Sequence, residues 1–156
     1  MDNFTQLKKE ITSYLKAAIP LDGLCIVEEF PQRYKQFPLK DSYIAVGIGA
    51  VQLPGASGEF SCPAGLINIT LRFDILCPQS QGELSCHHLF DRVCESFFFR
   101  ENNFGVQSIE CSETSFDASL SSLRLTATAK LTGRMTAALQ EAQTSLSDIV
   151  IVTKGV

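Results

Sequence analysis

The sequence of 156 residues contains no tryptophan, no run of basic residues and no long apolar stretch. Its 13 Lys and Arg are outnumbered by 17 Asp and Glu, which gives a formal net charge of −4. Because phosphate-driven binding needs clustered cations, sequence-specific binding of nucleic acid is not expected. No apolar run approaches the ~18 residues that span a bilayer, and the polar start MDNFTQLKKE is unlike a signal peptide. We therefore expect synthesis in the cytosol and no membrane partner.

Signatures of catalysis are also missing from the sequence. Neither Gly-x-Ser-x-Gly nor a phosphate-binding glycine loop occurs, and Gly47-Ile-Gly49 lacks the third glycine of a dinucleotide-binding turn. The adjacent Glu28 and Glu29 fall at the end of an expected strand, where consecutive side chains point to opposite faces. They are expected to be surface charges. The sequence therefore predicts no enzyme, no catalytic residue and no cofactor.

The remaining candidates for chemistry are two histidines and six cysteines, namely Cys25, Cys62, Cys77, Cys86, Cys94 and Cys111. No CxxC pair occurs, and in a reducing compartment such cysteines are expected to act as small apolar core residues. His87, Asp91 and Cys94 share helical spacing, but a zinc site needs four converging ligands, so no metal site is predicted. A small thiol-dependent or ligand-binding enzyme stays open as the less favoured alternative.

Two stretches have the apolar spacing of amphipathic helices. The first covers residues 3–18, with the stripe Phe4, Leu7, Ile11, Leu15 and Ala18. The second follows Pro78, where Ser80-Gln-Gly-Glu83 has the spacing of a capping box, and is expected to end near Phe98. Its expected buried stripe is Leu89, Phe90, Val93, Cys94 and Phe97.

Alternation of apolar and polar residues predicts strands in the rest of the chain. These are 24–27, 44–50, 66–76, 106–111, 123–131 and 149–153, and residues 135–146 fit a short helix. In 66–76, five apolar side chains face one way and Asn68, Thr70, Arg72 and Asp74 the other. Short loops between most strands favour antiparallel pairing. The prediction is one α+β domain over 1–156, a mainly antiparallel sheet covered on one face by two amphipathic helices.

Two irregular segments interrupt this pattern. Residues 30–43, FPQRYKQFPLKDSY, combine two prolines with aromatic side chains, and they are expected to form a rigid, extended connector. Residues 52–65, QLPGASGEFSCPAG, have the composition of a loop and are expected to form a hairpin or arm.

Three stretches carry a resemblance to a known family: EEFPQRYKQFPLKDSYIAVGIGAV (28–51), LINITLRFDILCPQSQGELSCHHLFDRVCESFFF (66–99) and SIECSETSFDASLSSLRLTATAKLTG (108–133). With them the chain resembles the tail terminator, or tail-completion, proteins encoded by prophages and tailocins of Gram-positive bacteria. The resemblance implies a hexameric ring that caps the last layer of a tail tube, stops its polymerisation and anchors the sheath end or the neck. It implies assembly in the host bacterial cytoplasm and a final place on the particle, at the tail end distal to the baseplate.

The expected partners are therefore copies of the same chain, the tube protein, and a sheath or neck protein. Aromatic residues often anchor interfaces, which makes the irregular segments and the terminal stretch 140–156 the expected contact regions. Cations on the polar sheet face are further candidates. The candidate interface residues are Phe30, Tyr34, Phe37, Phe60, Arg72, Arg124 and Lys130. A neck or baseplate ring of the same kind of particle is the main alternative.

Overall fold

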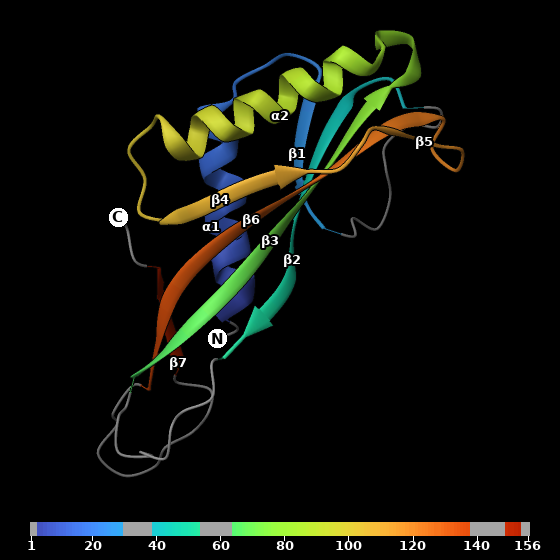
Figure 1. Cartoon of the computed structure of the whole chain (residues 1–156). Coiled ribbons are helices and arrows are strands. Elements are labelled where there is room, and N and C mark those ends of the chain that lie inside the picture. Colours follow the sequence, from blue (N-terminus) through green and yellow to red (C-terminus); the bar gives the residue numbers. More distant parts are fainter. Residues whose placement is uncertain (1–2, 30–38, 54–63, 138–148, 154–156) are drawn as a thin grey trace.

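The computed structural model describes residues 3–29, 39–53, 64–137 and 149–153. Within these ranges, two helices and a seven-stranded sheet form an α+β fold (Figure 1). In chain order the elements are α1 (Asn3–Ala18), β1 (Leu24–Glu28), β2 (Ser42–Gln52), β3 (Ala64–Pro78), the 3-10 turn η1 (Gln79–Gln81), α2 (Glu83–Phe98), β4 (Val106–Cys111), β5 (Ser115–Asp117), β6 (Ser122–Ala137) and β7 (Ile149–Thr153). The predicted fold class is confirmed.

The sheet has the strand order β1-β2-β3-β6-β4, and both β5 and β7 also pair with β6. All pairs are antiparallel except β1 with β2, which run parallel with Leu24 opposite Ser42. The amide of Ser42 donates to the carbonyl of Gly23 at 2.9 Å, so β2 begins beside the start of β1. A parallel pair needs a crossover connection of a dozen or more residues, and residues 29–41 separate the two strands in the sequence.

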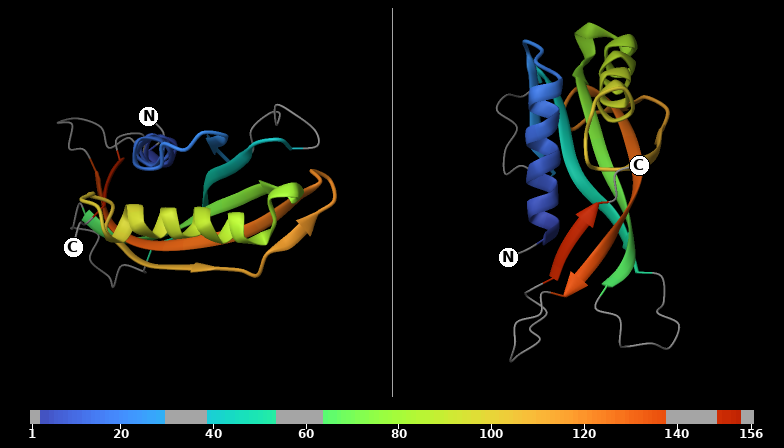
Figure 2. Two further views of the ribbon diagram at one scale, coloured as in Figure 1. Left: turned by 90° about the horizontal axis from the view of Figure 1, so that it is seen from above. Right: turned by 90° about the vertical axis from the view of Figure 1, so that its left-hand side faces the viewer.

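Both helices lie on the same face of the sheet, as the sequence predicts (Figure 2). The inward side chains of β3, including Ile69, Leu71 and Phe73, are buried beneath them. Ile11 of α1 and Val93 of α2 belong to the same core. The helices also contact each other, because the hydroxyl of Tyr14 donates to the carbonyl of Ser96 and its ring lies 5.8 Å from that of Phe97. A single hydrophobic layer therefore holds the helices and the sheet together.

The opposite face of the sheet carries a second, smaller apolar cluster at one end. Leu39, Tyr43 and Leu76 are buried there, and Val27 and Leu120 pack against them. Along β3 and β6, away from this cluster, the same face carries polar side chains. The sequence predicts the polar part of this face but not the cluster.

Three local features differ from the sequence predictions. The capping box at Ser80 is wrong: α2 begins after Gly82, whose φ of 77° suits glycine and which makes no side-chain cap. The helix predicted for 135–146 is wrong over its first three residues, because β6 continues to Ala137 and Met135 pairs with both Gly65 and Ile151. The rest of that prediction lies outside the described residues. The short strand β5 was not predicted.

Candidate functional site

The three cations proposed as interface residues lie on the sheet face that the helices leave uncovered. Arg72 belongs to β3, whereas Arg124 and Lys130 belong to β6. The register places Arg72 opposite Thr128 and Lys130 opposite Thr70, so side chains of both strands share this face. The structure therefore brings the three residues onto one surface, spread along the two longest strands of the sheet.

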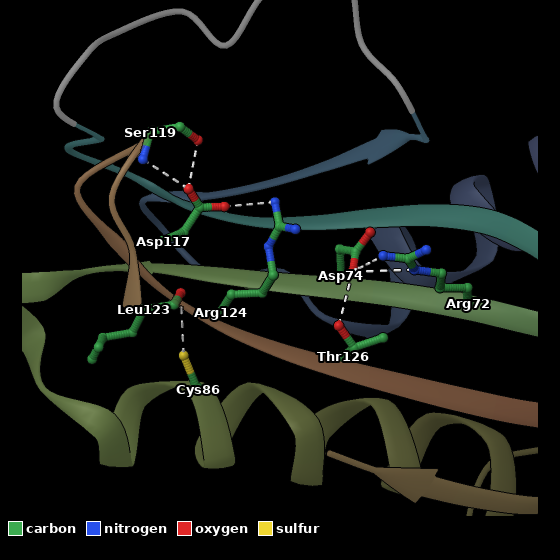
Figure 3. A network of polar contacts seen from close by, with 8 residues as sticks. All are labelled: Arg72, Asp74, Cys86, Asp117, Ser119, Leu123, Arg124 and Thr126. Atoms are coloured by element: carbon green, nitrogen blue, oxygen red, sulfur yellow. Dashed lines mark hydrogen bonds and ion pairs between the residues drawn. The ribbon is translucent and has the colours of Figure 1, made fainter. Parts of the chain in front are cut away.

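Asp74 neutralises Arg72 within this surface (Figure 3). Oδ1 of Asp74 accepts hydrogen bonds from Nε and Nη2 of Arg72 at 3.3 and 3.2 Å, and from the hydroxyl of Thr126 at 3.1 Å. The Asp74 side chain is only 13% exposed. Arg72 is thus held along the strand by a partly buried carboxylate.

Arg124 is held in a similar way at the turn between β5 and β6. Its Nη2 lies 2.8 Å from Oδ2 of Asp117, and the amide and hydroxyl of Ser119 both donate to the other oxygen of that carboxylate. The hydroxyl of Ser119 is the largest cause that lowers the pKa of Asp117, and the Arg124 charge adds to it against the effect of burial. Asp117 therefore fixes both the turn and the direction of Arg124.

Lys130 differs from the two arginines. Its side chain is exposed and makes no ion pair or hydrogen bond with any residue in the described part of the chain. Its neighbours along β6 do have partners, since Thr128 donates to Glu110 at 3.4 Å and Thr132 to Asn68 at 3.3 Å. Of the three candidate cations, Lys130 is the one whose charge is not already neutralised within those residues.

The four aromatic candidates cannot be placed in the same way. Phe30, Tyr34, Phe37 and Phe60 all lie outside the described residues, as do the greater part of the predicted connector and of the predicted arm. Of the terminal contact region 140–156, only the backbone of β7 is described. These candidates stay predictions.

A different group of residues surrounds a cavity at the end of the sheet where α2 begins. The cavity has a volume of about 420 Å³, and its lining includes Asp41, Ser42, Ser85 and His88. The side chains of Ser42 and Ser85 also lie beside the thiol of Cys77. The thiol of Cys86, in the first turn of α2, donates to the carbonyl oxygen of Leu123 at 3.8 Å (Figure 3). Both cysteines are fully buried.

Neighbouring groups shift the pKa values of the two thiols in opposite directions. Cys86 is the largest cause that lowers the pKa of Cys77, and the side chains of Ser85 and Ser42 lower it further against the effect of burial. Cys77, together with burial, raises the pKa of Cys86.

Sequence reasoning predicted cysteines in the core, which is confirmed for Cys77 and Cys86 but is wrong for the exposed Cys111, and it missed this pair. Nine positions separate the two residues, so they match no known spacing. One signal was available: Cys77 continues the inward positions of Ile75, and Cys86 continues the buried stripe of Leu89 and Val93. When a helix follows a strand closely and packs on the same face of the sheet, the inward positions of both elements lie near each other.

Among the described residues, no three side chains of His, Cys, Asp or Glu lie close enough together to hold a metal ion. The helices in those ranges include none that is long and apolar enough to cross a membrane. Comparison of the chain with protein-family models gives no match, and comparison with curated proteins gives no significant match either.

Proposed function

We propose that this chain is a structural subunit of a hexameric ring that closes the end of a phage-like tail tube. One observation carries the proposal: both helices cover one face of the sheet, and the other face presents a long polar surface with Arg72, Arg124 and Lys130. Such a surface, on the two longest strands, suits contact with other subunits or the lining of a ring. The resemblance to tail terminators is the reason for proposing a ring that closes a tail tube rather than another kind of assembly.

A closed ring needs two different contact surfaces on each subunit, because neighbours meet head to tail. The order of the sheet supports this requirement, since its two ends are different strands, β1 and β4. Strand addition at such an edge is a common way to join chains. The aromatic candidates Phe30, Tyr34, Phe37 and Phe60 are proposed to add anchors to these contacts.

The charge of the chain also suits this role. A formal net charge of −4 without basic clusters would let DNA pass through a ring without binding to its wall. The proposed partners are the tube protein and, on the other side of the ring, a sheath or neck protein. In this role the chain is no enzyme and needs no cofactor.

Electron microscopy of tail tubes mixed with the protein tests the proposal. We expect ring-shaped density on the tube end distal to the baseplate and at no other place. Density at the baseplate end would instead support the baseplate alternative, and density only on the capsid portal would support a neck ring. Tubes whose two ends both stay bare at saturating protein would contradict the terminator and the baseplate assignments.

A further inference from the structure

We propose that the cavity at the start of α2 binds an ammonium or guanidinium group carried on a short aliphatic stem. The charged head pairs with the carboxylates of Asp22 and Asp41, and the stem lies on apolar side chains of the lining. This inference is independent of the ring, because it uses a cavity at one end of the sheet and none of the candidate interface residues.

Three parts of the chain meet at this cavity, at the end of the sheet where β2 and α2 begin (Figure 1). They are the turn between α1 and β1, the residues that lead into β2, and η1 with the first two turns of α2. The volume of about 420 Å³ lies within the range of small-molecule sites in proteins, roughly 300–1,000 Å³. A ligand here would contact all three parts at once.

The parallel pairing of β1 with β2 brings two carboxylates to this cavity. Leu24 lies opposite Ser42, and the amide of Ser42 donates to the carbonyl of Gly23 at 2.9 Å, so the residues just before the two strands lie side by side. Oδ1 of Asp41 is 3.9 Å from the position of a Cβ atom at Gly23, which places this carboxylate against the turn that carries Asp22. Neither Asp22 nor Asp41 forms an ion pair with another described residue.

The charges of the lining favour a cation. The two carboxylates are accompanied by one ammonium group, that of Lys40, which is exposed and pairs with neither of them. With a neutral His88, the lining therefore has one negative charge in excess. A cation placed between Asp22 and Asp41 gains an attraction that the described residues leave unused, whereas an anion there is repelled.

The hydrogen bonds of two serines in the lining favour the same class of ligand. Ser42 is only 7% exposed, and its hydroxyl donates to Oε1 of Gln81 at 3.3 Å. The amide and the hydroxyl of Ser85 both donate to the carbonyl of Gly82, at 3.3 and 2.6 Å. Because these hydrogen atoms are already used, the serine oxygens offer acceptors, which suit the N–H groups of an ammonium or guanidinium head.

Apolar side chains provide the surface for the stem. Leu21 and Leu24 are half-buried and Leu89 is buried, and all three line the cavity. A chain of methylene groups packs on such side chains while its charged head stays with polar partners, as the stems of lysine and arginine do. The lining thus matches both halves of the proposed ligand.

A second cavity, of about 460 Å³, lies at the other end of α2 and lacks this combination. The charges of its lining balance, since it contains one cation and one anion, Arg100 and Glu101. The side-chain amide of Asn102 there already donates to the carbonyl oxygens of Phe97 and Arg100, at 3.0 and 2.9 Å. This cavity therefore provides a control carboxylate, Glu101, in a space of similar size.

Titration of the isotope-labelled full chain with butylguanidinium, followed by NMR, tests the proposal. We expect saturable shifts of the amide signals of Gly23, Ser42 and Ser85. Butylurea, which has nearly the same shape without the charge, should bind at least about fivefold more weakly. Butylurea that binds as tightly as butylguanidinium, or shifts that do not saturate at these amides, would overturn the proposal.

Variants of the carboxylates test the same site. In the double variant Asp22→Asn/Asp41→Asn, the dissociation constant of butylguanidinium should rise at least about fivefold, because both opposite charges are lost. Glu101→Gln should leave it unchanged. Equal affinities of the double variant and the unaltered chain would contradict the assigned carboxylates. If the double variant does not fold, the comparison of the two ligands on the unaltered chain decides the matter.

A free small molecule and a basic side chain of another protein share this chemistry, and one more titration separates the two sources. The probe is a peptide with one arginine between two pairs of glycines and with both ends blocked. An affinity equal to or above that of butylguanidinium assigns the site to a side chain of a partner protein. A clearly weaker affinity assigns it to a free amine or guanidine, because the flanking backbone then does not fit.

Discussion

Individual charged side chains on the uncovered sheet face differ in whether the chain already supplies their partners. Asp74 and Asp117 neutralise Arg72 and Arg124. If binding broke these pairs, each partly buried carboxylate would lose its opposite charge, which costs free energy. Lys130 has no such partner within the described residues. At the scale of residues, Lys130 is therefore the one of the three proposed cations that a neighbouring subunit of the proposed ring could use at the lowest cost.

Phe73 tests which face of β3 belongs to the core. Its side chain is fully buried, and its ring lies 5.8 Å from that of Phe97 in α2. We expect Phe73→Ala to lower the free energy of unfolding by about 3–5 kcal/mol, because it removes contacts and leaves a cavity. Denaturant unfolding measures this change. The control Phe99→Ala removes a ring that is 83% exposed, and we expect it to cost less than about 0.5 kcal/mol. A loss below about 1 kcal/mol for Phe73→Ala would contradict the assigned face.

Asp117 links stability to acid pH. Its pKa is lowered in the folded chain, so its contribution is present above its unfolded value of 3.8 and is lost as the pH falls through the lower folded value. We expect Asp117→Asn to destabilise the chain by about 0.5–1 kcal/mol at neutral pH, since the pair is partly solvated. Below pH 3.8 the difference from the unaltered chain should shrink.

Unfolding of both chains at several pH values measures this trend. Asp22→Asn is the control, because Asp22 is exposed and forms no ion pair within the described residues. A difference for Asp117→Asn that stays constant, or that grows as the pH falls, would show that the carboxylate does not hold Arg124 and Ser119 as described.

At the scale of elements, local periodicity carries most of the information about this fold. The alternation in 66–76 and 123–131 identifies the two central strands, and the stripe from Leu7 to Leu15 identifies α1, because each pattern reflects one buried face. Pro78 marks the end of β3, as predicted. Elements with one solvent-exposed face and one buried face could thus be predicted from the sequence.

Features set by pairing between distant strands could not be predicted in this way. The residues that follow Met135 in the sequence have the apolar spacing of a helix. Met135 nevertheless belongs to a strand, because it pairs with Gly65 and Ile151. The parallel pairing of β1 with β2 joins strands that a long stretch of sequence separates, and the start of α2 depends on a turn of four residues after β3. For the proposed interface, sequence reasoning found the shared face of the three cations but not the carboxylates that neutralise two of them.

Gly47 tests how closely β1 and β2 approach on the uncovered face. A Cβ atom at this position would overlap the carboxylate of Glu29 and lie only 2.8 Å from its Cβ, so the side chain of Glu29 covers the glycine. We expect Gly47→Ala to cost about 1–3 kcal/mol in unfolding free energy, as overpacking does. In a Glu29→Ala background the same change should cost clearly less.

Gly49 provides the matched control in the same strand. A Cβ atom there would lie 3.5 Å from the nearest atom, the carbonyl oxygen of Thr70, which is an ordinary contact. We expect Gly49→Ala to change stability by less than about 0.5 kcal/mol. Equal costs for Gly47→Ala with and without Glu29 would show that another group limits the space.

At the scale of the whole molecule, the two sides of the sheet differ in kind. One side holds both helices and the main core, and the other holds a small apolar cluster and a long polar surface (Figure 2). This asymmetry suits a subunit that is stable by itself and keeps one side for its neighbours. Assembly and stability should therefore respond to different substitutions.

Reversal of the Lys130 charge tests this separation. We expect Lys130→Glu to weaken ring assembly by at least about tenfold, since it places a like charge against an acidic neighbour, and to leave the unfolding free energy almost unchanged. Lys9→Glu is the matched control, because Lys9 is exposed on the outer side of α1. Sedimentation velocity measures the ratio of hexamer to monomer. Equal effects of the two variants would remove Lys130 from the interface, and a monomeric mass under all conditions, with tubes included, would contradict the ring.

The growth of tail tubes in the presence of the full chain tests the central claim most directly. Purified tube protein is polymerised from baseplates with and without the chain, and tube lengths are measured by electron microscopy. If the chain caps the tube, growth stops at its addition, and the stopped tubes carry a ring at the end distal to the baseplate. Tubes that continue to the same length, with bare ends and all of the chain left in solution, would contradict the claim.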